Sequence, residues 1–295
     1  MMKAITILIF IILLCTPVFI LAGEAEDKGM EIATQRKIHD QGWGDSSAEM
    51  IMTLRNKSGQ KSIREIRIKS LEVIDDGDKG LTIFDRPLDV KGTAFLSFSH
   101  PLGNDDQWLY LPALKRVKRI SSKNKSGPFM GSEFAYEDLS SFEIEKYSYK
   151  YLADENCGDK SPQPINLPDV VLQKSSPANK TVDKFSVDKS PQHKCFKVEN
   201  TPLYKHSGYT KIISWIDQQE YRVYKAEYYD RKKSLLKTLT FSNYQQYKNK
   251  FWRADQYKMI NHQTGKSTDL DWKNYQFSIG LSDKDFNKNT LKRIR

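Results

Sequence analysis

SAEMIMTLRNKSGQKSIREIRIKSLEV, residues 47–73, contains the pattern that decides the fold class. Every second residue in 48–54 is apolar, and in the second half Ile66 and Ile68 alternate with basic residues. An apolar period of two is typical of a strand that buries one face. Because the turn-forming residues 56–59 separate the two runs, the stretch predicts a β-hairpin.

Runs of the same kind continue along most of the chain. Further strands are predicted at 81–84, 92–99, 107–111, 142–152, 211–216, 221–229, 235–241, 251–261 and 267–277. Tight connections join most of them, and an aromatic share of 12% suits a sheet. We therefore expect a mainly β protein with one antiparallel, strongly curved sheet, whose concave side must be filled by side chains, a helix or a ligand. Short helices are expected at 31–41 and from Ser282.

The beginning of the chain has the composition of an export signal. Lys3 precedes a short apolar run, after which small residues lead into the first acidic ones. This order predicts a secretory signal peptide over residues 1–22, cleaved on export to the periplasm. An uncleaved anchor helix is the alternative, because the run approaches the length of a membrane span. Since Leu14 stands before Cys15, where lipoprotein processing needs a small residue, we expect no lipid on Cys15.

The positive charge changes its meaning in an exported protein. The net charge of +10 becomes +9 if Lys3 leaves with the signal. In a cytosolic protein this charge, interleaved with Tyr and Trp, would suggest nucleic-acid binding. Export argues against a nucleic-acid partner and favours an anionic membrane surface or an acidic protein. A solvated basic face without a partner is the simpler interpretation.

The cysteines predict a covalent link across an insertion. Cys157 and Cys195 remain after the signal, and an oxidising compartment with an even count suggests one disulfide, with two free thiols as the alternative. The bridge would close a loop of about 38 residues and stabilise the fold by roughly 4 kcal/mol. Residues 154–194 are rich in Pro, Ser, Lys and Asp, so we expect an exposed insertion in a single domain over 23–295. Two cysteines without clustered histidines cannot build a four-ligand zinc site, and we expect no metal and no cofactor.

Four longer segments resemble a known family. They are DDQWLYLPALKRVKRI (105–120), SGPFMGSEFAYEDL (126–139), WIDQQEYRVYKAEYYDRKKSLLKTLTFSNY (215–244) and NHQTGKSTDLDW (261–272). With them, most of residues 42–295 resemble the outer-membrane lipoprotein-sorting protein family, which is related in fold to the periplasmic carriers LolA and LolB. The resemblance implies an incomplete antiparallel β-barrel, curved round a hydrophobic cavity and partly covered by helices. Family members usually lack most of 157–194, so the insertion is a departure.

The same resemblance implies a function. It suggests a periplasmic carrier of lipid or lipoprotein acyl chains that works beside an inner-membrane efflux-type transporter. A non-enzymatic envelope module that binds a protein partner and no ligand is the alternative. The sequence does not favour an enzyme, because its 5 histidines stand outside HExxH and it has neither GxSxG nor a P-loop. The sequence does not identify the molecule that would be carried.

A carrier of acyl chains needs a dry apolar surface, which alternating strands can supply. The candidate residues for the cavity or its cover are Met50, Met52, Leu54, Phe95, Phe98, Trp108, Tyr110, Phe129, Met130 and Phe134. The sequence does not decide which alternate residues point inward, so Leu109 and Leu111 compete with Trp108 and Tyr110.

One loop and the basic run before it complete the candidate set. Phe129 and Met130 lie among glycines, where backbone freedom is high, and are predicted to form a mobile apolar flap over the cavity mouth. The basic residues proposed to meet lipid phosphates or an acidic patch on a transporter are Lys115, Arg116, Lys118 and Arg119. The alternative is a solvated β-hairpin followed by a structurally pinned loop.

Overall fold

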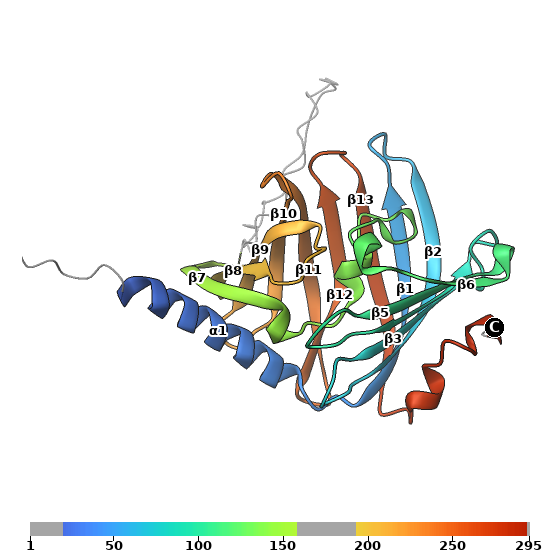
Figure 1. Ribbon diagram of the computed structural model, residues 1–295, viewed down its shortest axis with the longest axis horizontal. Coiled ribbons are helices and arrows are strands. Elements are labelled where there is room, and N and C mark those ends of the chain that lie inside the picture. The colour runs from blue at the N-terminus through green and yellow to red at the C-terminus, as the bar shows by residue number, and fades with distance from the viewer. Residues whose placement is uncertain (1–19, 158–192, 294–295) are drawn as a thin grey trace, which may run out of the picture.

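A curved sheet of thirteen antiparallel strands dominates the computed structural model, which describes residues 20–157 and 193–293 (Figure 1). The strands are β1 (Asp45–Arg55), β2 (Lys61–Leu71), β3 (Lys79–Arg86), β4 (Ala94–Phe98), β5 (Asp106–Leu111), β6 (Arg116–Arg119), β7 (Tyr147–Asn156), β8 (Lys194–Pro202), β9 (Tyr209–Asp217), β10 (Val223–Asp230), β11 (Leu235–Tyr247), β12 (Phe251–Asn261) and β13 (Ser267–Phe277). In space they follow the order β6-β5-β4-β3-β2-β1-β13-β12-β11-β10-β9-β8-β7. The sheet is not closed into a barrel, because β6 and β7 are its two edges. The predicted mainly β fold with an incomplete, curved antiparallel barrel is confirmed.

The first hairpin of the sequence pairs with the last strand of the chain, so the beginning and the end of the strand meander lie side by side. It forms β1 and β2 as predicted, with Met50 opposite Ile66. On its other side β1 pairs with β13, the last strand, where Met52 lies opposite Leu270. The predicted ranges of β12 and β13 agree with the structure to the residue, because alternation and the turn at 262–266 mark both ends.

Parts of the predicted element pattern differ from the structure. Residues 142–146 lead into β7 instead of belonging to it, and the basic run forms the short edge strand β6. The helix expected from Ser282 is replaced by two short 3₁₀ turns, Asp283–Asp285 and Leu291–Arg293.

One α-helix is present among the described residues. Helix α1 (Ile20–Asp40) is longer than the predicted 31–41. Its first three residues fell within the predicted signal peptide, and residues 23–30, to which no element was assigned, contain strong helix formers such as Ala25 and Glu26. Ile32 and Ala33 pack in an apolar cluster with side chains of β7, β8, β9 and β10. A Cβ on Gly29 would lie 2.9 Å from the backbone nitrogens of residues 150 and 151, so only glycine lets the helix approach β7 this closely. Helix α1 thus closes one edge of the sheet (Figure 1).

The chain crosses the concave side to connect the two edges. After β6 it must reach β7 at the opposite edge, and it does so through residues 120–146, here called the crossing segment. Its short 3₁₀ turns are Ser122–Asn124, Phe129–Gly131, Tyr136–Leu139 and Ile144–Lys146. In Figure 1 this green segment lies inside the curve of the sheet. The crossing segment therefore supplies side chains to whatever lies on the concave face.

The convex face of β3, β4 and β5 is covered as well. Phe286 and Leu291, which follow β13, are buried in a cluster with Leu81, Ile83 and Leu96. This part of the sheet is consequently apolar on both faces, as strands buried on two sides are.

The predicted disulfide is confirmed. Cys157 and Cys195 are bonded and buried beside Ile213 and Trp215. The ends of the predicted insertion are strand, since β7 runs to Asn156 and β8 begins at Lys194. The middle of the insertion and most of the predicted signal peptide lie outside the described residues. Within the described ranges, no helix combines the length and the apolar character needed to cross a bilayer.

Candidate functional site

Three adjoining hollows lie on the concave face. Their volumes are about 340, 370 and 400 Å³, and Arg36, Phe241 and Tyr257 line all three. We call the first the polar hollow, because charged side chains of the crossing segment line it. The second is the helix hollow, lined by the end of α1, and the third is the apolar hollow. Shared lining residues mean that the three hollows meet at one junction.

The apolar hollow combines strand side chains with the crossing segment. Its apolar lining consists of Trp43, Met50, Met52, Ile68, Phe95, Phe129, Phe134, Leu139, Leu239, Phe241, Leu270 and Trp272. The strand residues reach it because alternate positions of β1, β4, β11 and β13 point to the concave side. Five candidate residues thus lie together, namely Met50, Met52, Phe95, Phe129 and Phe134. Leu54 packs against the same cluster but does not line the hollow.

Three candidates lie on the other face of the sheet. Phe98, Trp108 and Tyr110 pack in the convex cluster beneath the C-terminal turns, so their assignment to the cavity is corrected. Leu109 and Leu111 take the concave positions instead. The sequence could not show this, because both faces of β4 and β5 are apolar and a strand pattern alone does not reveal which face is inside.

The loop predicted to be a mobile flap is packed into the cluster. Phe129 is 1% exposed, and its ring centroid lies 5.2 Å from that of Phe95 and 5.4 Å from that of Tyr136. Arg64 Nη1 donates to the Met130 carbonyl at 2.5 Å, and the Glu133 backbone N–H donates to Thr268 Oγ1 at 3.0 Å. Met130 has a left-handed backbone, with φ of 50°, and is half-buried against the same cluster. These contacts favour the alternative of a pinned loop.

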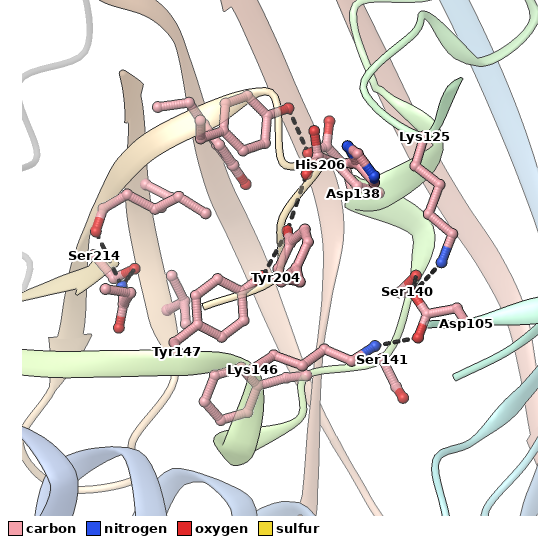
Figure 2. A pocket seen from close by; sticks show the side chains of 18 of the residues that line it. Asp105, Lys125, Asp138, Ser140, Ser141, Lys146, Tyr147, Tyr204, His206 and Ser214 are labelled. Atoms are coloured by element: carbon pink, nitrogen blue, oxygen red, sulfur yellow. Dashed lines mark hydrogen bonds and ion pairs between the residues drawn. The ribbon is translucent and has the colours of Figure 1, made fainter. Parts of the chain in front are cut away.

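The polar hollow contains a buried ion cluster, shown in Figure 2. Asp105 pairs with Lys125 at 2.9 Å and also with Lys146, and the side chains of all three are less than 10% exposed. Burial by itself would raise the pKa of Asp105, but the two ammonium groups outweigh it and hold this pKa below its ordinary value. Two lysines share one carboxylate, so the cluster carries an excess positive charge.

Two neighbouring carboxylates of the crossing segment are fixed by hydrogen bonds. Glu137 accepts hydrogen bonds from the hydroxyls of Tyr204 and Ser207, both at 2.9 Å, and from the backbone N–H of Gly208 at 2.8 Å. Burial and the charge of Asp138 raise the pKa of Glu137. A Cβ on Gly208 would lie 2.8 Å from Glu137 Oε1, so this close approach requires glycine.

Asp138 is held by a cation as well. It pairs with Lys237 at 2.6 Å and accepts the Tyr209 hydroxyl at 2.7 Å. Sequence analysis missed these buried charges, because a Lys or Asp in a polar stretch is ordinarily solvated. The only local signal was the run of acids and aromatics at 133–138.

The basic run lies apart from the hollows. Strand β6 and the turn before it expose four basic residues, Lys115, Arg116, Lys118 and Arg119, and none of them lines any of the three hollows. Arg119 pairs with Asp106, while Val117 packs toward the convex cluster. Charged side chains on a short edge strand also prevent pairing with other chains, which is a sufficient structural reason for them.

Metal binding has no support among the described residues. In them, no three His, Cys, Asp or Glu side chains gather in a group that could hold a metal ion.

Known proteins share this architecture. A family model described as “Uncharacterized protein” matches residues 76–293. A crystal structure from Vibrio parahaemolyticus, named as an outer membrane lipoprotein-sorting protein domain, is similar at 55% sequence identity and a TM-score of 0.78, over 91% of this chain and 100% of that one. The chain belongs to the outer membrane lipoprotein-sorting protein family. This family assignment confirms the resemblance seen in the four sequence segments.

More distant structures place the sorting family among related folds. A DUF1329 family protein from Desulfovibrio piger is 26% identical, with a TM-score of 0.75 over 90% of this chain and 99% of that one. A LolA superfamily protein from Nitrosomonas europaea is 17% identical, with a TM-score of 0.62 over 88% of this chain and 98% of that one, and shows the fold alone. No curated protein matches the chain.

Proposed function

We propose that this protein is a periplasmic carrier that holds the hydrocarbon part of a lipid, or the acyl chains of a lipoprotein, in the apolar hollow. The observation that supports the proposal is the hollow itself, about 400 Å³ on the concave face and lined by Met50, Met52, Phe95 and Leu270. Ligand pockets range from about 300 to 1,000 Å³ and are mostly apolar. The membership in the lipoprotein-sorting family agrees with this role.

The lining suits a flexible hydrocarbon. Each buried CH₂ group contributes about 0.8 kcal/mol, so one chain gains enough to offset the loss of its own freedom on binding. Methionine adapts its shape to its neighbours, which helps a pocket to accept chains of different length. No reaction is proposed at this site, because a carrier needs only burial and release.

Delivery requires contact with membranes or their proteins. We propose that export by the signal peptide places the chain in the periplasm, beside an inner-membrane efflux-type transporter. The exposed basic run at 115–119 is suited to an anionic lipid surface or an acidic patch on that partner. The flap interpretation of Phe129 is not part of the proposal.

A structural role without a ligand is the second candidate, and one observation favours it. The crossing segment places Phe129 and Phe134 on the concave face, where they already fill part of its interior. Under this alternative, the remaining hollows would be packing defects and the protein would act through its outer surface.

Mass spectrometry of an organic extract separates the two candidates. The mature protein is purified gently from its native envelope, without detergent, and the lipid in the extract is quantified per protein molecule. The carrier proposal predicts a stoichiometric lipid that is absent from a parallel extract of an unrelated periplasmic protein. A clean protein with no enriched lipid would support the structural role.

A further inference from the structure

Arg36 is a cation at the junction of the hollows with no carboxylate of its own. Its side chain comes from α1 and lines the polar, helix and apolar hollows. Among the described residues it makes no hydrogen bond and no ion pair, and its one specific contact is with the ring of Phe142, 3.9 Å from the guanidinium carbon. A contact with an aromatic face uses no N–H, so its five donors remain available.

Two carboxylates beside this part of α1 are already engaged elsewhere, and a third, Asp78, lines the helix and apolar hollows but makes no ion pair with Arg36. Asp40, one turn further along α1, pairs with Arg253 at 2.6 Å. Glu143 pairs with Lys37 at 2.9 Å. Burial lowers the pKa of Arg36, although a guanidinium remains charged at neutral pH. Arg36 is half-buried, so the absence of a counter-ion costs part of its hydration. Groups with such perturbed electrostatics cluster at functional sites.

Two tyrosines share the lining of these hollows with the cation. Tyr257 lines all three hollows and Tyr228 lines two, and in the described part of the chain neither hydroxyl makes a hydrogen bond. The positive charge of Arg36 opposes the rise that burial gives to the pKa of both phenols. Three side chains with free donors therefore line the polar and the apolar hollow together.

The charge balance of the polar hollow favours an anion. Three cations, Arg36, Lys125 and Lys146, line it together with three carboxylates, Asp105, Glu137 and Asp138, and Lys237 pairs with Asp138 from outside the lining. With Lys237 counted, one positive charge is in excess, and Arg36 is the one of these four cations that makes no ion pair. An oxyanion at the junction would neutralise it without displacing any existing ion pair.

We propose that Arg36, assisted by the Tyr228 and Tyr257 hydroxyls, binds the oxyanion of a singly acylated or alkylated amphiphile, a carboxylate or a phosphate, whose hydrocarbon lies in the apolar hollow. The junction is the boundary between a charged and an oily cavity, which is where the head of such a molecule must lie. The inference rests on the carrier function and narrows its cargo from any hydrophobic molecule to an anionic one.

Calorimetric titration with matched probes tests it. The probes are dodecanoate, dodecyl phosphate, dodecanol and inorganic phosphate, and the proteins are the wild type, Arg36→Gln, Tyr257→Phe and Arg86→Gln. Arg86 is an exposed arginine outside the hollows, so Arg86→Gln is the matched control. We expect Arg36→Gln to weaken the binding of both anionic probes by about ten- to a hundred-fold. Tyr257→Phe should weaken the binding of the same probes by roughly three-fold. Dodecanol binding should change by less than about two-fold, because it has no charge to lose.

Each result has a distinct meaning. If Arg36→Gln weakens dodecanol as much as dodecanoate, Arg36 shapes the hollow and the headgroup proposal is overturned. If it weakens neither, the headgroup proposal is overturned while the carrier function stands. Inorganic phosphate that binds as tightly as dodecyl phosphate would show an isolated phosphate site instead. If no alkyl probe binds the wild type, the carrier function itself fails.

A stability measurement accompanies the titration. If Arg36 serves the ligand and not the fold, Arg36→Gln unfolds at a temperature equal to or above that of the ligand-free wild type, because removing an unpaired, half-buried charge relieves its partial desolvation. A marked drop in that temperature would identify a structural arginine and overturn the proposal.

Discussion

Asp78 lies where the helix hollow and the apolar hollow meet, and burial raises the pKa of its carboxyl to about 6. The Val73 backbone N–H donates to it at 3.3 Å, and no ion pair joins it among the described residues. In the unfolded chain an Asp carboxyl has a pKa near 3.9. Between about pH 4 and 6 the folded state therefore binds more protons than the unfolded state, so stability falls as the pH rises through this window.

Replacing Asp78 should remove this dependence of the free energy of unfolding on pH. We expect Asp78→Asn to raise the free energy of unfolding at pH 8 by about 1 kcal/mol, since two pKa units correspond to about 2.7 kcal/mol and the carboxyl is only partly buried. At pH 4 the variant and the wild type should be nearly equal. Urea unfolding at both pH values measures the difference, with the exposed Asp75→Asn as control. An equal free energy at pH 8 would contradict the assignment.

The charges on the concave face are the residues that sequence analysis could not place. Lys125, Lys146 and Asp105 are far apart in the chain, and nothing local distinguishes them from solvated surface residues. Their burial depends on the path of the crossing segment, which is a long-range property. Arg36 was missed for the same reason. The methionines of β1 were found, because alternation within one strand is a local signal.

At the scale of elements, the seating of α1 on β7 depends on Gly29. Gly29→Ala places a Cβ 2.9 Å from two backbone nitrogens of β7, so the helix must move away from the strand. We expect a loss of about 1–3 kcal/mol in the free energy of unfolding, typical of an overpacked contact, although alanine is otherwise the better helix former. Gly23→Ala is the control, since its Cβ would meet nothing within 4 Å. Chemical denaturation measures the free energy of unfolding of both variants. A Gly29→Ala protein that is more stable than the wild type would contradict the close contact between α1 and β7.

The crossing segment explains both the success and the failure of the site prediction. Phe129 and Phe134 were candidates for the cavity or its cover and do line the apolar hollow, yet Phe129 was assigned with Met130 to a mobile flap. Glycines at 127 and 131 suggested freedom, whereas Arg64 and Thr268 fix the loop through its backbone. A sequence shows which residues permit flexibility but not which distant partners remove it.

The alternation of strands predicted the sheet but not its inner face. Phe98, Trp108 and Tyr110 were candidates for the cavity although the inward set was left open, and in the structure they pack with Phe286 and Leu291 on the outer face. Only the path of the chain after β13 explains why β3, β4 and β5 need a second apolar face. In contrast, the turn at 262–266 marked the adjoining ends of β12 and β13 in the sequence itself, so these ends could be predicted without information on tertiary contacts.

At the scale of the whole molecule, an open sheet of thirteen strands leaves a concave face larger than its own loops can fill. Helix α1 closes one end and the crossing segment covers the middle, and three hollows remain between them. Their arrangement, polar beside apolar, is what an amphiphilic ligand requires. The central claim is that a hydrocarbon chain occupies the apolar hollow.

Gly80 offers a way to fill that hollow without disturbing its walls. It lies on β3, lines the apolar hollow, and a Cβ built on it would meet nothing within 4 Å. A phenylalanine at this position would therefore project into the space assigned to the ligand. Thr240→Phe adds the same ring at an exposed position of β11 and serves as the matched control.

The most direct measurement is the binding of dodecanol, titrated by calorimetry into wild type, Gly80→Phe and Thr240→Phe, each confirmed to be folded by circular dichroism. The account predicts one equivalent bound by the wild type and by Thr240→Phe, and binding at least about ten-fold weaker for Gly80→Phe, since the ring takes the place of several buried CH₂ groups. A folded Gly80→Phe protein that binds dodecanol as tightly as the wild type would contradict it.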